Sequence, residues 1–186
     1  MTKLRKINYE VKCATQQVIV SRTDTEGNIV YCNPTFLEVN GFRSSEIIHQ
    51  PHSIVRHPDM PKTIFHIIWS IISQGMPIQA VLKNQTNKGE YYWTLITIKP
   101  QKDRDNKVIS YVAYGKQAPD SVIRTMQELY RILYDVEQDH GIDAALEYLE
   151  SYLNEQGMTY AEYMKYLTKN REFKCLCDFI KHIIIH

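Results

Sequence analysis

The residues of this chain best suited to bind a ligand lie at positions 50–61, where Arg56, His57 and Asp59 stand among three prolines. Each proline fixes its own φ and disfavours helix at the preceding residue, so we expect a stiff, irregular loop that holds its polar side chains in set directions. Arg56 offers a planar fork of donors suited to a phosphate or carboxylate, and His57 can donate or accept beside it. On local pattern alone, a proline-rich surface turn with solvated charges is the competing interpretation.

The segments before this loop predict a β-hairpin followed by a short helix. Residues 18–23 and 29–32 are β-rich and are separated by acidic turn formers and Gly27, which is typical of a hairpin. Asn33 precedes a proline and is a good N-cap, and Gly41 ends the helix.

After the loop the pattern predicts one longer helix and then strands. Apolar residues recur at three- and four-residue spacing from Met60 to near Gly75, with Trp69 in the middle of this helix. Three strands should follow, at residues 78–84, 91–100 and 108–116. This order of elements predicts an α+β fold in which helices cover one face of an antiparallel sheet.

The last third of the chain has a helical texture. Helices are predicted to run to about His140, over 142–155 and over 159–169, with a fourth at 172–185. Gly141 breaks the series, as does a later glycine, which favours a small helical hairpin or bundle packed on the sheet domain over one long coiled coil. The tyrosines gathered here are Tyr130, Tyr134, Tyr148, Tyr152, Tyr160, Tyr163 and Tyr166. We interpret them as half-buried packing residues, with a docking surface as the alternative.

Composition narrows the class of protein. The chain has 186 residues with 22 basic and 21 acidic side chains, so its net charge of +1 gives no sign of a nucleic-acid groove or a polybasic membrane patch. No apolar run approaches the roughly 18 residues needed to cross a bilayer, and the N-terminus lacks the apolar stretch of a signal peptide. We therefore predict a cytoplasmic protein without direct membrane insertion.

The cysteines do not form a disulfide framework in an intracellular protein of this size. Cys32 lies in a predicted strand and is expected to act as a small hydrophobe. Near the C-terminus, Cys175, His182 and His186 would share one helix face, which makes a metal site conceivable. Cys177 would point elsewhere and the spacing is too short for a zinc finger, so an amphipathic terminal helix with incidental Cys and His is favoured.

Short motifs along the chain, each present once, can be compared in residue type and spacing with known protein families. They are Asp24-x-x-Gly27-x-Ile29-x-Tyr31-x-Asn33-x-x-Phe36, Asn40-Gly41-Phe42, Gln50-Pro51-His52, Val55-Arg56-His57-Pro58-Asp59-Met60-Pro61, Trp69, Lys83-Asn84, Gly89, Tyr92-Trp93 and Gly115. On these residues the segment 18–117 resembles a PAS domain, and the Val-Arg-His-Pro-Asp-Met-Pro run narrows the resemblance to the sensory PAS domain of bacterial aerotaxis (energy-taxis) receptors. The resemblance implies a PAS fold with a five-stranded antiparallel sheet at 18–118, an N-terminal cap segment at 1–17 and a C-terminal helical extension at 119–186.

The resemblance also implies an FAD site. It carries Arg56, His57 and Asp59 over as FAD ligands, Asn84 as an amide facing the flavin ring, and Trp69 as a wall of the pocket. An amide can donate or accept, so Asn84 can answer protonation of the ring on reduction by reversing its hydrogen bond. The plainer interpretations are a strand residue near a turn for Asn84 and core packing for Trp69.

One departure from the family leaves the cofactor open. Flavin-binding PAS domains often have Pro-Trp where this chain has Pro77-Ile78, so stacking worth about 0.5–1.5 kcal/mol would be absent, although Ile78 can still wall the pocket. Haem is the alternative cofactor, with His52, His57 or His66 as axial ligand. A PAS interaction module without cofactor is the third possibility.

The resemblance implies a redox or oxygen (energy) sensor that signals by contact with a membrane-bound chemoreceptor or transducer, and homodimerisation is possible. An enzyme is disfavoured, because the sequence has no Gly-rich phosphate loop, kinase boxes or nucleophile elbow.

Overall fold

The computed structural model describes residues 9–12 and 17–169. Its sheet has the strand order β2-β1-β5-β4-β3, and every neighbouring pair is antiparallel. The strands are β1 (Ile19–Thr23), β2 (Ile29–Cys32), β3 (Ile78–Gln85), β4 (Tyr91–Lys102) and β5 (Val108–Gln117). The helices are α1 (Pro34–Asn40), α2 (Ser44–Ile47), η1 (His52–Val55), α3 (Lys62–Ser73), α4 (Asp120–Glu155) and α5 (Tyr160–Lys169). The predicted α+β architecture with a five-stranded antiparallel sheet is confirmed.

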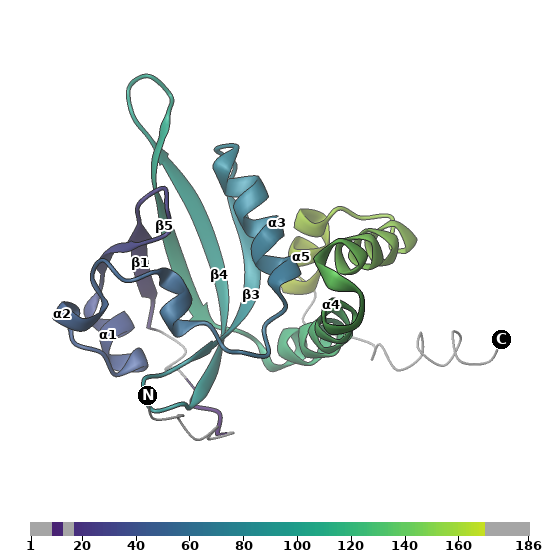
Figure 1. Cartoon of the computed structure of the whole chain (residues 1–186), viewed down its shortest axis with the longest axis horizontal. Coiled ribbons are helices and arrows are strands. Elements are labelled where there is room, and N and C mark those ends of the chain that lie inside the picture. Colours follow the sequence, from purple (N-terminus) through teal and green to yellow (C-terminus); the bar gives the residue numbers. More distant parts are fainter. Residues whose placement is uncertain (1–8, 13–16, 170–186) are drawn as a thin grey trace.

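The arrangement in space separates the short helices from the C-terminal ones (Figure 1). α1 and α2 lie at the β1–β2 end of the sheet, whereas α4 and α5 lie beside α3 at the β3 end. The hairpin between β4 and β5 extends well past the other strands. None of the helices in the described part of the chain is long and apolar enough to span a membrane.

The predicted helix signals at Asn33 and Gly41 are confirmed in detail. The Oδ1 atom of Asn33 accepts from the backbone N–H of Phe36 at 3.0 Å, which caps α1, and also from Val20 N–H at 3.0 Å. Its Nδ2 donates to Val18 O at 2.8 Å. Gly41 ends α1 with φ 71°, a left-handed conformation that glycine adopts without steric cost. Asn33 therefore ties α1 to β1 as well as capping the helix.

Two apolar clusters form the interior. The smaller cluster lies under α1 and η1 and comprises Ile19, Ile29, Phe36, Ile47, Val55 and Tyr92. The larger cluster joins α3, the inner face of β3 and the C-terminal helices. In β3 the residues Ile78, Ala80 and Leu82 face α3 at the two-residue period of a strand, yet Val81 on the opposite face is also fully buried. The C-terminal helices account for this second buried face.

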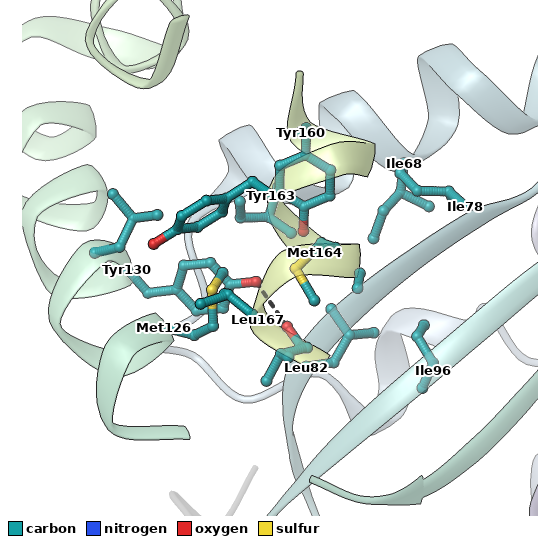
Figure 2. Close-up of a cluster of buried hydrophobic side chains, with 14 of the residues drawn as sticks. Ile68, Ile78, Leu82, Ile96, Met126, Tyr130, Tyr160, Tyr163, Met164 and Leu167 are labelled. Carbon is teal, nitrogen blue, oxygen red and sulfur yellow. Dashed lines mark hydrogen bonds between the residues drawn. The ribbon is translucent and has the colours of Figure 1, made fainter. Parts of the chain in front are cut away.

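The C-terminal helices α4 and α5 pack on the sheet domain, as predicted, and α4 bends in its middle. α4 is interrupted at Gly141, whose φ of 87° and ψ of 176° are not helical, and α5 follows after Gly157. Figure 2 shows Tyr160, Met164 and Leu167 of α5 directed into the space between α4 and β3. A fourth helix predicted at 172–185 lies outside the described residues.

The tyrosines of these helices divide between packing and surface. Tyr130, Tyr160 and Tyr163 are buried, and the hydroxyl of Tyr163 lies 2.8 Å from that of the partly buried Tyr152. Tyr148 and Tyr166 are exposed, and for them the alternative of a docking surface stays a prediction. The predicted packing role is therefore confirmed for Tyr130, Tyr160 and Tyr163, which are more deeply buried than expected.

Candidate functional site

A cavity of about 320 Å³ lies between α3, η1 and the inner face of the sheet. Its lining comprises Ser21, Thr23, Glu26, Gly27, Pro51, His52, Ser53, Arg56, Phe65, Ile68, Trp69, Ile72, Leu82, Asn84, Ile96, Ile98, Tyr111 and Ala113. Three of the five predicted site residues, Arg56, Trp69 and Asn84, are among them. The walls are mostly apolar and aromatic, with a few polar groups, as is usual for sites that bind small molecules.

Arg56 enters the cavity from the loop after η1. The guanidinium lies 4.1 Å above the centroid of the Phe65 ring, and its Nη2 donates to Met60 O at 2.8 Å. The backbone of Arg56 forms a bridge with Asn84 at the edge of β3. Burial lowers the pKa of Arg56, and the negative charge of Glu137 opposes that shift. Arg56 is therefore a fixed, partly desolvated cation whose remaining donors can meet an anion.

Asn84 provides an amide on the sheet wall. The side chain is 8% exposed, and its Nδ2 donates to the Oγ1 of Thr94 at 3.2 Å. Thr94 is the cross-strand partner of Leu82 in β3, so it lies on the same face of the sheet as Leu82 and Asn84. Asn84 and Thr94 therefore form a small polar patch on an otherwise apolar face. An amide at this place can recognise a ring edge that carries both donors and acceptors.

Trp69 closes the cavity on the α3 side. Its ring packs edge-to-face on Tyr111 with centroids 5.5 Å apart, and the side chain is 38% exposed. The indole also lies against Gly27, where an added Cβ would come within 3.0 Å of a ring carbon. Gly27 has a φ of 90°, so both its conformation and this close contact favour glycine. The competing interpretation of Trp69 as a buried core residue does not fit its exposure.

His52 is a polar cavity residue that the sequence motif did not single out as an FAD ligand. Its Nε2 lies 3.0 Å from the hydroxyl of Ser21, and its ring packs edge-to-face on Phe36 at 6.0 Å. Burial lowers the pKa of His52 to about 4, so the imidazole is neutral near pH 7. Of the three histidines considered as haem ligands, all within the described residues, His52 lines the cavity and His57 and His66 do not.

His57 and Asp59 lie on the other side of the loop. The His57 ring packs edge-to-face on Tyr91 at 5.8 Å, and its Nδ1 accepts from the backbone N–H of Asp59 at 3.1 Å. The Asp59 carboxylate pairs with Lys83 at 3.4 Å. Both residues sit at the outer edge of β3, and neither lines the cavity that contains Arg56. Their predicted role as ligands stays a prediction.

The expectation that Ile78 walls the pocket is wrong. Ile78 is 4% exposed, belongs to the larger apolar cluster and is absent from the lining of the cavity. Ile78 lies on the face of β3 that is turned toward α3, and Figure 2 shows it beside Ile68 of that helix, so it packs in the apolar core next to the cavity.

The other candidate sites contribute little. Cys32 is a free, partly buried thiol, less buried than expected for a core residue. No group of three or more potential metal ligands occurs within residues 9–12 and 17–169. The cluster of Cys175, Cys177, His182 and His186 lies outside the described residues.

A family model described as PAS fold matches residues 29–114. The chain is 34% identical over 120 residues to the aerotaxis receptor of Escherichia coli, a match that covers 64% of this chain and 24% of that receptor. It is 28% identical over 114 residues to a nitrogen fixation regulatory protein of Klebsiella pneumoniae, covering 61% of this chain and 23% of that protein. The matches therefore span about a quarter of the length of these relatives.

Solved structures agree on the fold. A light-oxygen-voltage domain studied with a flavin analogue superposes with a TM-score of 0.55 at 19% identity, covering 61% of this chain and 87% of the other. The dark-state domain of the blue-light photoreceptor Aureochrome1 gives a TM-score of 0.54 at 20% identity, covering 63% and 87%. At this identity the likeness shows the fold alone. Residues 29–114 therefore have a PAS fold, and this part of the chain is similar in sequence to a segment of the aerotaxis receptor.

Proposed function

We propose that this protein is a redox sensor that binds a flavin, FAD, in the cavity under α3 and signals by protein–protein contact. The observation that carries the proposal is the convergence of Arg56, Trp69 and Asn84 on one cavity from three separate elements. These residues supply the three contacts that a flavin nucleotide needs: a donor for phosphate, a flat wall and an amide for the ring edge.

The size and lining of the cavity fit this ligand. A volume of about 320 Å³ lies at the lower end of small-molecule sites, which suits a ring system inside and phosphates toward an opening. Phe65 and Trp69 offer aromatic walls, and Arg56 is held on Phe65 with part of its fork still uncommitted. We infer that the ring is held among these walls and that Arg56 meets the phosphates.

A bound flavin would supply a ring that gains electrons and protons and so changes its hydrogen-bonding pattern. Asn84 is the residue placed to respond, because its amide can exchange donor for acceptor and its Nδ2 already has a partner in Thr94. Its strand lies at the edge of the sheet and contacts the C-terminal helices, so a change at Asn84 adjoins the surfaces that a partner could read.

The names of two relatives support the proposed partner and setting. One relative is named as an aerotaxis receptor and another as a nitrogen fixation regulator, which supports a signalling role for this chain. We propose a membrane-bound chemoreceptor or transducer as the partner, a cytoplasmic location and a non-enzymatic function. Homodimerisation is compatible with this role. The proposed unit boundaries are 1–17, 18–118 and 119–186.

The absorption spectrum of the purified chain tests the cofactor. We expect a yellow protein whose flavin bands in the blue bleach with dithionite, and release of FAD on denaturation, identified by chromatography against FAD and FMN standards. A colourless protein that takes up no added FAD would contradict the proposal and favour an interaction module without cofactor.

Haem remains the second candidate because one histidine, His52, does line the cavity. A haem protein would show a Soret-type band instead of flavin bands, and His52→Ala would remove it. The hydrogen bond of His52 to Ser21 and the mostly aromatic and aliphatic lining favour flavin.

A further inference from the structure

A carboxylate of the C-terminal extension closes the first turn of α3. Glu137, on α4, accepts from Lys62 N–H at 2.9 Å, from Thr63 N–H at 2.5 Å and from the Thr63 hydroxyl at 2.6 Å. The two backbone donors belong to the first turn of a helix, which has no intrahelical acceptors for them. Glu137 thus caps a helix that lies 74 residues earlier in the chain.

No residue at the start of α3 can perform this task. The residue before the helix is Pro61, which has no capping side chain, and the first turn contains no acidic residue. Glu137 is 9% exposed and Thr63 is fully buried, so the three hydrogen bonds form in a low-dielectric setting where each is strong. A carboxylate at a helix N-terminus also gains from the helix dipole.

The helix capped by Glu137 and the loop before it both carry residues that line the cavity. α3 carries Phe65 and Trp69, two aromatic walls of the cavity. The loop that ends at Pro61 carries Arg56, which donates to Met60 O one residue before that proline. Glu137 also acts on Arg56 through its charge, which opposes the lowering of the Arg56 pKa by burial. Movement of α4 would therefore shift the ring wall and the phosphate donor together.

We propose that Glu137 is a positioning residue for the cavity, and that its cap on α3 couples the C-terminal extension to whatever occupies the site. The coupling follows from reciprocity: if a ligand favours one position of α3 and Arg56, then fixing α4 on α3 raises the affinity for that ligand, and the ligand in turn fixes α4. The identity of the ligand as FAD rests on the function proposed above, whereas the cap itself does not.

The first test compares Glu137→Gln with Glu147→Gln, a matched change at an exposed position of the same helix. Hydrogen exchange is followed in the full chain without added flavin. In Glu137→Gln one acceptor becomes a donor facing N–H groups, so protection of the Lys62 and Thr63 amides should fall about tenfold or more. Glu147→Gln should leave this protection unchanged, and equal protection in both variants would overturn the proposal.

The second test titrates FAD into the same variants. We expect the Kd for FAD to rise about fivefold or more in Glu137→Gln and to stay unchanged in Glu147→Gln. Lost protection with an unchanged Kd would refute the coupling while leaving flavin binding intact. If the parent chain binds no FAD, the proposed function fails, and the exchange data alone decide whether Glu137 holds α3.

A smaller change keeps the proposal testable if Glu137→Gln does not fold. Thr63→Val removes one of the three donors and keeps the shape of the side chain, so it should lower protection and affinity in the same direction by a smaller factor. If Thr63→Val is folded by circular dichroism and neither it nor Glu137→Gln changes protection or affinity, Glu137 has no positioning role.

Discussion

The loop at residues 52–61 has an inward and an outward side with different chemistry. Inward, His52 and Arg56 line the cavity, and burial lowers the pKa of both side chains. Outward, His57 and Asp59 form a chain of contacts with Lys83 at the edge of the sheet, where Asp59 is half exposed. The inward groups are a cation and a neutral imidazole that face a cavity and have few partners of opposite charge, whereas the outward groups form ion pairs with one another.

The difference arises from backbone conformation. Arg56 is extended, with φ −72° and ψ 129°, and it bridges Asn84 in the manner of a short extra strand. Successive residues of a strand point to opposite faces, so Arg56 shares the cavity face with Asn84 while His57 shares the outer face with Lys83. Adjacent residues of one motif can therefore serve two different surfaces.

The largest expected effect is at Arg56. Arg56→Ala removes the charge-assisted contacts proposed for the phosphates, which should weaken FAD binding by about 2–3 kcal/mol, or roughly 30- to 150-fold. Isothermal titration or flavin occupancy measures the loss, and Arg131→Ala at an exposed site is the control. Circular dichroism must remain unchanged; if the fold collapses together with occupancy, Arg56 supports the structure and its assignment as a ligand loses its basis.

The second effect concerns the pH dependence of stability. His52 has a pKa of about 4 in the folded state and about 6.5 when unfolded, so between these values the unfolded chain binds the extra proton. The neutral imidazole of His52 therefore does not lower the free energy of unfolding well above pH 6.5, and the folded state loses stability as the pH falls toward 4. We expect the free energy of unfolding to drop by about 2 kcal/mol from pH 7.5 to pH 5.0 on account of this group.

Urea denaturation at the two pH values measures this drop. His52→Gln should remove most of the drop in the free energy of unfolding that is due to His52. His66→Gln, at an exposed position, is the control. A pH profile identical in parent and His52→Gln would show that the imidazole is not held neutral by the fold.

A smaller effect is expected at Asn84. Asn84→Ala should weaken FAD binding by only about 0.5–1.5 kcal/mol, because one uncharged hydrogen bond is lost, yet it should uncouple reduction from conformation. The observable is hydrogen exchange in β4 and β5 with and without dithionite under anaerobic conditions. A variant that responds to reduction as fully as the parent would rule out Asn84 as the switch, and a parent without any response would refute redox sensing.

The smallest effect is expected on the outward side. Asp59→Asn removes the charge of a half-exposed carboxylate that pairs with Lys83, so the free energy of unfolding should change by only about 1 kcal/mol or less. On the geometry of the loop, FAD affinity should change far less than in Arg56→Ala. A comparable loss of affinity would show that the ligand extends around the loop to the outer edge of β3, as the resemblance to aerotaxis receptors implies.

The fold was largely predictable because its signals are local. Asn33 before a proline, Gly41 after a helix and Gly141 between two apolar series each act within a few residues, and each has the predicted role. The convergence of Arg56, Trp69 and Asn84 was predictable only through the resemblance to a family, because nothing in their spacing shows that a loop, a helix and a strand meet.

The remaining features depend on tertiary contacts. Which side chains of the loop face inward depends on its pairing with β3, and the burial of Ile78 depends on how α3 packs against β3. Glu137 looks like an ordinary surface acid in a polar helix, and only the placement of α4 against α3 reveals its partners. Such pairings between distant segments leave no periodic signal in either segment.

The two outer strands of the sheet bear on how this protein can associate. At one edge, the outward carbonyls of Val81 and Lys83 in β3 accept from the Tyr130 hydroxyl at 2.7 Å and from His57 N–H at 3.3 Å. At the other edge, Ile29 of β2 exchanges backbone hydrogen bonds with residues 49 and 50. Open edges invite strand addition between chains and aggregation. Because these backbone groups are already engaged, lengthening of the sheet is hindered at both positions, and docking through side chains on a face of the sheet is the more accessible mode of association.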